Sequence, residues 1–174
     1  KSSRHGTVST AECVPLQIFV SARSGRRFLC GYLCTSRRFS CFRLDALKHV
    51  ALLETAEDYG QLLDKLTQNR PSLWGVSFQG GGGRRLESLS MILQVIEPGE
   101  GYIVDRLKRE GRGGSVTKVG EHVYRYETHA FDCNEMLPWV RTFTGRILSL
   151  ECSSKLVEQR FYRDLETMYR IYDI

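Results

Sequence analysis

Residues 26–48 read RRFLCGYLCTSRRFSCFRLDALK, and this stretch decides the expected architecture of the first half of the chain. Residues 28–34 and 39–50 are rich in aromatic, aliphatic and Cys side chains, which favours two β-strands joined by a short basic connection. An alternating segment at residues 14–22 precedes them and leads into a Ser-Gly turn signal. These segments predict a three-stranded antiparallel meander, which must curl into a barrel or be covered to be stable.

Positive charge is concentrated in the same half of the 174-residue chain, whose formal net charge is +5. Residues 1–80 carry eleven Lys and Arg against six Asp and Glu, whereas residues 81–174 carry fourteen of each. A local field of one sign attracts polyanions, and aromatic side chains beside arginines offer stacking surfaces for bases. The alternative is a solvated basic face on a small β-domain. The candidate residues for binding nucleic acid or a nucleotide are Arg23, Arg26, Arg27, Tyr32, Arg37, Arg38 and Arg43, with Phe39 and Phe42 as further stacking candidates.

A second basic group lies in the other half and consists of Arg106, Lys108, Arg109 and Arg112. It either extends the basic surface or forms a solvated helix face balanced by neighbouring acids, and the balanced face is the favoured interpretation. Arg141 and Arg146 flank an expected helix end, where arginines often bond the last carbonyl groups, so we assign them a structural role.

The pattern Thr-x-x-Asp at residue 55 predicts the start of a helix with an apolar stripe, which Pro71 ends. Residues 80–83 are four glycines followed by two arginines. This run lacks the Lys-Ser/Thr pair and the helix start of a phosphate-binding loop, so it predicts a hinge or interdomain linker.

The second half predicts a regular order of elements. Strands are expected at residues 89–95, 116–119, 123–130 and 146–150, and helices at residues 102–110, from 132 and at 154–169, with Pro138 distorting the middle helix. The order β-α-β-β-α-β plus a terminal helix is the ferredoxin-like arrangement. The chain is therefore expected to be an α+β protein with a leader at residues 1–13, a small β-domain with a helix at 14–80 and a ferredoxin-like domain at 81–174.

The six Cys and four His residues predict no metal, cofactor or catalytic site. No Cys-x-x-Cys pair occurs and no His lies at zinc-ligand spacing, so we interpret the cysteines as buried structural thiols in a reducing compartment. The histidines have no evident nucleophile or carboxylate around them, which argues against an enzyme. Neither a signal peptide nor a membrane-spanning run is visible, so we expect a cytoplasmic location.

Three segments resemble a known family: RRFLCGYLCTSRRFSCFRLDAL at residues 26–47, RLKREGRGG at 106–114 and YETHAFDCNEMLPWVRTFTGRIL at 126–148. They are similar to the WYL domain, a small Sm- or SH3-like β-barrel of bacterial transcriptional regulators, and to the extension that follows it, over about residues 14–172. The Trp-Tyr-Leu tripeptide that names the family is replaced by Arg27-Phe28-Leu29. Basic residues that frequently flank the Phe-Arg-Leu-Asp run are replaced by Ser40 and Ala46.

The resemblance implies a module that senses a ligand or nucleic acid within a bacterial transcriptional regulator. It further implies an N-terminal helix-turn-helix module in the full-length chain and a homodimer to which the C-terminal domain contributes contacts. The alternative function is a protein–protein interaction or accessory module, for example in a phage-defence system. In that case the arginines would contact an acidic protein surface in place of phosphates.

Overall fold

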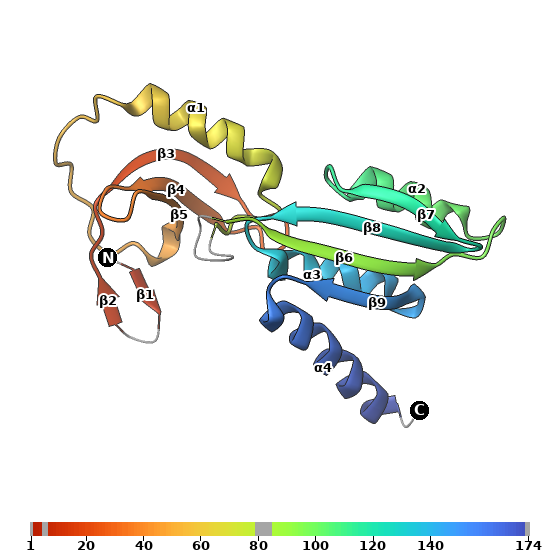
Figure 1. Ribbon diagram of the computed structural model, residues 1–174. Coiled ribbons are helices and arrows are strands. Elements are labelled where there is room, and N and C mark those ends of the chain that lie inside the picture. The colour runs from red at the N-terminus through yellow and green to blue at the C-terminus, as the bar shows by residue number, and fades with distance from the viewer. Residues whose placement is uncertain (1, 5–6, 79–84, 173–174) are drawn as a thin grey trace.

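The computed structural model describes residues 2–4, 7–78 and 85–172 of the chain. It is a mixed α and β protein in which a three-stranded and a four-stranded antiparallel sheet lie at opposite ends of an elongated molecule (Figure 1). The expected glycine linker at residues 80–83 lies outside the described residues. None of the helices in the described part is both long and apolar enough to cross a lipid bilayer.

The chain begins with a short hairpin where the sequence predicted an irregular leader. Its strands pair antiparallel and precede a meander in the order β3-β4-β5, as predicted. The bounds are β1 Ser2–Arg4, β2 Thr7–Ser9, β3 Cys13–Val20, β4 Arg27–Leu33 and β5 Arg38–Arg43. The third strand of the meander is shorter than expected, because the chain turns into the 3-10 helix η1, Leu44–Ala46, directly after it.

The three-stranded sheet is covered on one face and is not a closed barrel in the described part of the chain. Helix α1, Tyr59–Asn69, lies across it and buries Leu62 and Leu66 (Figure 1). This cover supplies the burial that a small open sheet needs. The helix begins four residues after the predicted cap at Thr55, and it runs into the 3-10 helix η2, Arg70–Ser72, at the predicted proline.

A β-bulge in β3 changes which side chains face this core. Pro15 pairs with Gly31 and Gln17 pairs with Cys30, so Leu16 is the extra residue. Sequence alternation placed Ile18 and Val20 on the same face as Leu16. The shifted register leaves them 56% and 63% exposed and turns Phe19 inward instead. A one-residue slip in register reverses the facing of every later side chain in a strand.

The second half has the predicted order of elements. Its strands are β6 Glu87–Gln94, β7 Ser115–Gly120, β8 Val123–Ala130 and β9 Ile147–Cys152. Its helices are α2 Gly101–Glu110, η4 Cys133–Met136, α3 Leu137–Val140, η5 Arg141–Arg146 and α4 Lys155–Tyr172. The sheet order is β7-β8-β6-β9, with all neighbours antiparallel.

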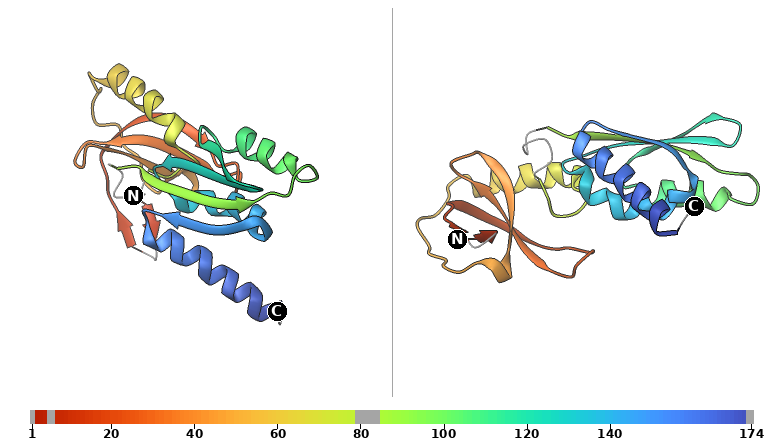
Figure 2. Two further views of the ribbon diagram at one scale, coloured as in Figure 1. Left: turned by 45° about the vertical axis from the view of Figure 1, so that its right-hand side comes forward. Right: turned by 90° about the horizontal axis from the view of Figure 1, so that it is seen from below.

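The helices cover one face of the four-stranded sheet and leave the other face open (Figure 2). Along β8 the side chains alternate between the two faces. The core contains Tyr124, Tyr126 and Thr128, and the open face carries Arg125, Glu127 and His129. The expected helix around Pro138 is split into the 3-10 turn η4, one α-turn and the 3-10 turn η5. Pro138 lies in the first turn of the α segment, where its missing N–H leaves no hydrogen bond unmade.

The two halves are joined by contacts as well as by the chain. The Phe131 amide donates to the Ser72 carbonyl over 3.0 Å, and the Phe78 and Phe131 rings lie 5.1 Å apart. Trp74 packs against Trp139 with ring centroids 5.1 Å apart. Phe131 thereby belongs to the core beneath α1, although it follows a strand of the other sheet.

Candidate nucleic-acid interface

The candidate arginines of the N-terminal sheet fall into two groups at opposite ends of β4. Arg23 and Arg26 lie in the β3–β4 connection and Arg27 begins β4; we call these three the hairpin arginines. Arg37 lies in the β4–β5 connection and Arg38 begins β5; we call these two the turn arginines. Since a strand rises about 3.3 Å per residue, the length of β4 separates the two groups by roughly 20 Å.

Both groups consist mainly of solvent-exposed arginines. Arg38 is half-buried and the other four arginines are exposed. Within the described residues, none of the five forms an ion pair. Arg37 adopts a φ of +48°, a left-handed conformation that non-glycine residues seldom adopt and that is common at functional turns. The ends of β4 are therefore the two positively charged regions of this sheet.

Arg43 differs from these five because it already has an anionic partner. Its side chain projects on the same face of β5 as Phe39, and it lies at the hairpin end opposite Phe28. Its guanidinium grips the Asp45 carboxylate in two hydrogen bonds of 3.0 and 2.6 Å. The hydrogen bond from Arg43 lowers the pKa of Asp45, and the charges of Arg43 and Arg26 add to this. Arg43 would have to exchange this partner to bind a phosphate.

The aromatic side chains chosen as stacking platforms are mostly used in packing. Phe39 is only 8% exposed and cannot stack on a base, which corrects the expectation from the sequence. Tyr32 is half-buried, packs edge-on against Phe39 at 5.4 Å and has the Lys65 ammonium 5.5 Å from its ring centroid. Phe42 points to the opposite face, where it helps to line a cavity of about 240 Å³. Tyr32 thus remains a candidate ligand contact only at its exposed edge.

The second basic group is divided between structural and exposed side chains. Arg106 bonds Glu110 and the Thr142 hydroxyl over 2.9 and 2.8 Å and lies 4.5 Å from the Phe143 ring centroid. Lys108 is exposed, and Arg109 makes only a 3.5 Å contact with Glu110. The favoured interpretation, a balanced helix face, therefore describes Arg106 well.

Arg112 connects the two halves of the molecule. It donates to the Trp74 carbonyl oxygen, and its guanidinium lies 5.1 Å from the Trp74 ring centroid. The arginines at 141 and 146 are also engaged, because they pair with Asp164 and Glu100 respectively. Most arginines that the sequence singled out in the second half therefore hold the fold together.

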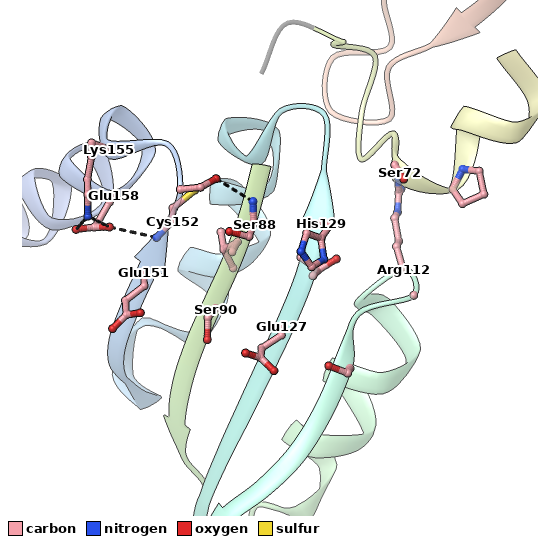
Figure 3. Close-up of a pocket in the computed structure, with 16 residues that line it drawn as sticks. Ser72, Ser88, Ser90, Arg112, Glu127, His129, Glu151, Cys152, Lys155 and Glu158 are labelled. Atoms are coloured by element: carbon pink, nitrogen blue, oxygen red, sulfur yellow. Dashed lines mark hydrogen bonds and ion pairs between the residues drawn. The ribbon is translucent and has the colours of Figure 1, made fainter. Parts of the chain in front are cut away.

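The open face of the four-stranded sheet forms a cavity of about 900 Å³ that sequence reasoning did not select (Figure 3). Pairing across the strands sets Ser90 between Glu127 and Glu151, and sets His129 opposite Ser88. The alternation of buried and polar residues along β8 was the available signal for this face. Within the described residues no hydrogen bond joins His129 to a serine or a carboxylate of this face.

Comparison with known protein families and sequences does not assign this chain to a family. No protein-family model matches the chain, and no curated protein sequence matches it. The resemblance to WYL-containing regulators therefore stays a hypothesis that rests on the sequence motifs alone.

Proposed function

We propose that the chain is a regulatory module that binds single-stranded nucleic acid through the hairpin and turn arginines. The observation that carries the proposal is the position of five arginines at the two ends of one strand. These five have no ion-pair partner among the described residues, whereas Arg106, Arg141 and Arg146 pair with acids. Unpaired guanidinium groups bind phosphates with charge-assisted, bidentate hydrogen bonds.

The separation of the two groups favours a polymer over a single nucleotide as the ligand. Contacts at both ends of β4 must span roughly 20 Å, which several linked phosphates can do and one nucleotide cannot. With the aromatic rings largely buried, phosphate contacts supply most of the affinity and the binding is sequence-tolerant. Such binding is expected to depend strongly on salt.

The fold supports assignment to the architecture that the motifs suggest. The strand order β7-β8-β6-β9, with helices on one face, supports our assignment of the second half to a ferredoxin-like domain. We assign the three-stranded sheet with α1 to an open relative of the Sm- and SH3-like domains. On this assignment the chain is the sensing part of a WYL-type bacterial regulator, follows a helix-turn-helix module and acts as a homodimer in the cytoplasm.

One observation favours the alternative function, a module for protein–protein interaction. The last turns of α4 expose Met168, Tyr169, Ile171 and Tyr172 beside a groove of about 640 Å³. Exposed apolar side chains of this kind mark surfaces that bind a protein. We also assign this surface to the contact between subunits of the proposed dimer. It lies in the half of the molecule without the hairpin and turn arginines, so a protein bound there would leave those arginines accessible.

The proposal is tested by binding of a fluorescent single-stranded oligonucleotide to matched variants at low salt. The Arg37→Ala/Arg38→Ala variant removes two charges from the proposed site, and Lys108→Ala/Arg109→Ala removes two from the exposed part of the second group. We expect the first variant to bind at least tenfold more weakly and the second to bind within twofold of wild type. Equal weakening by both would mean that net charge alone attracts the strand, and the proposed site would be wrong.

A further inference from the structure

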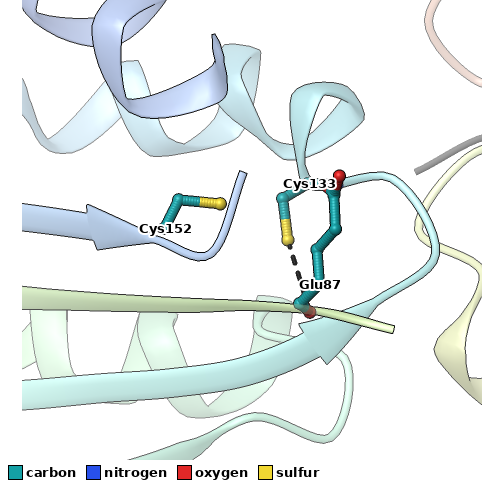
Figure 4. A group of neighbouring side chains, drawn as sticks. All are labelled: Glu87, Cys133 and Cys152. Atoms are coloured by element: carbon teal, nitrogen blue, oxygen red, sulfur yellow. Dashed lines mark hydrogen bonds between the residues drawn. The ribbon is translucent and has the colours of Figure 1, made fainter. Parts of the chain in front are cut away.

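Three buried side chains with metal-binding atoms meet at one end of the four-stranded sheet (Figure 4). Glu87 is the first residue of β6, Cys133 begins η4 just after β8, and Cys152 is the last residue of β9. Because β6 runs antiparallel to β8 and β9, its start lies beside their ends. The ligand atoms of the three side chains all lie within 4.8 Å of one another.

Main-chain groups fix the orientation of these side chains. The Cys133 amide donates to a Glu87 carboxylate oxygen over 2.8 Å, and the Cys133 sulfur lies 3.7 Å from the Glu87 carbonyl oxygen. The Cys152 sulfur accepts a hydrogen bond from the Ser154 amide, at the start of α4. Hydrogen bonds of this kind orient ligands in protein metal sites. The three groups are thus preorganised by the backbone of three separate elements.

The cluster is electronegative, and its carboxylate has no cationic partner in the part of the chain that the structure describes. Glu87 is only 8% exposed, and none of the described Lys, Arg or His residues forms an ion pair with it. Asp132 and Glu158 lie close enough to act on the same thiols electrostatically. A buried carboxylate without a positive partner is costly, so the site favours a bound cation.

We propose that Glu87, Cys133 and Cys152 bind a thiophilic divalent cation of the Zn²⁺ class. Two thiolates and one carboxylate would occupy three positions of a tetrahedron, with water in the fourth. Binding releases the two thiol protons to solvent. Zn–S and Zn–O distances of about 2.3 and 2.0–2.2 Å require the three ligand atoms, now within 4.8 Å of one another, to close around the cation. The cation would clamp the start of β6 to the ends of β8 and β9.

The test uses Co²⁺ as a spectroscopic substitute for Zn²⁺ on the whole chain, kept reduced with a phosphine and with its free thiols counted beforehand. Wild type should bind one Co²⁺ with thiolate-to-metal charge-transfer absorption in the near ultraviolet. The Cys133→Ser/Cys152→Ser variant should lose this absorption. Cys30→Ser/Cys41→Ser is the matched control, since Cys30 and Cys41 lie opposite each other on β4 and β5 and are not part of the Glu87 cluster. It should keep the absorption.

A Glu87→Gln variant covers the case in which the double serine variant does not fold. We expect it to bind Co²⁺ at least tenfold more weakly than wild type. A hundredfold excess of Zn²⁺ over its Kd should raise the melting temperature of wild type by about 5–10 °C and that of Glu87→Gln by less. The proposal is overturned if reduced wild type binds no Co²⁺, or if the Cys30→Ser/Cys41→Ser variant loses the absorption while the Cys133→Ser/Cys152→Ser variant keeps it.

Discussion

Replacing Glu135 should destabilise the molecule more than its position near the surface suggests. Its half-buried carboxylate accepts hydrogen bonds from the Val76 and Ser77 amides over 3.1 and 2.9 Å, and so holds residues 75–77 of the first half against the second. The backbone approaches so closely that a Cβ on Gly75 would lie 2.4 Å from a carboxylate oxygen.

The cost of Glu135→Ala follows from the two amides that lose their acceptor. Each unsatisfied, partly buried donor costs about 1–3 kcal/mol. Part of this is offset, because burial raises the pKa of Glu135 and therefore disfavours the ionised carboxylate that the substitution removes. We expect a net loss of about 2–4 kcal/mol in the free energy of unfolding. Glu135→Gln keeps one acceptor oxygen and should lose less.

Urea denaturation at neutral pH measures this loss. The midpoint urea concentration should fall, while the dependence of the free energy of unfolding on urea concentration stays the same. Glu166→Ala, at an exposed position on α4, is the control and should change the free energy of unfolding by less than about 0.5 kcal/mol. A raised pKa in the folded state means that the stability linked to Glu135 protonation is present at acid pH and lost as pH rises through that pKa. The free energy of unfolding of Glu135→Gln, relative to that of wild type, should therefore increase as pH rises. A Glu135→Ala variant as stable as the control would refute the reasoning.

Four further substitutions, one of them a control, test the packing and the ionisation of buried groups in the second half by urea denaturation. Gly114→Ala should cost about 1–3 kcal/mol, because its Cβ would lie 2.4 Å from the buried Tyr126 ring, while Gly99→Ala meets open space and should be nearly neutral. Phe161→Ala should cost about 3–5 kcal/mol, since the ring is 1% exposed in the core. Burial raises the pKa of Tyr126 from 10.0 to about 12, so its stabilising contribution is lost as pH rises through that value. Between pH 10.0 and about 12, the Tyr126→Phe variant should therefore lose less stability than wild type.

The sequence predicted the second sheet well because each of its elements carries its own local periodicity. Strand β8 was expected at residues 123–130 and occupies Val123–Ala130, where buried and exposed side chains alternate from Tyr124 to Ala130. The errors came where tertiary contacts override a local pattern. Glu135 fits a capping box with Asp132, but its carboxylate bonds the distant amides of Val76 and Ser77 instead.

The first sheet shows what periodicity does not capture. An extra residue at the bulge in β3 is invisible in the sequence, so the outward facing of Ile18 and Val20 was not predicted. The concentration of arginines was evident from composition, but their division between the two ends of β4 depends on strand register. Likewise, Glu87, Cys133 and Cys152 are too far apart in sequence to form a recognisable metal motif, and only the strand order brings them together.

The salt dependence of single-strand binding by wild type tests the proposed function most directly. If each of the five unpaired arginines contacts one phosphate, the slope of log Kobs against log salt concentration should be about −3.5. Affinity measured by fluorescence anisotropy should then fall by about 100-fold between 50 and 200 mM salt. Absence of binding at low salt, or a slope shallower than about −1, would contradict the proposal that these arginines form a nucleic-acid interface.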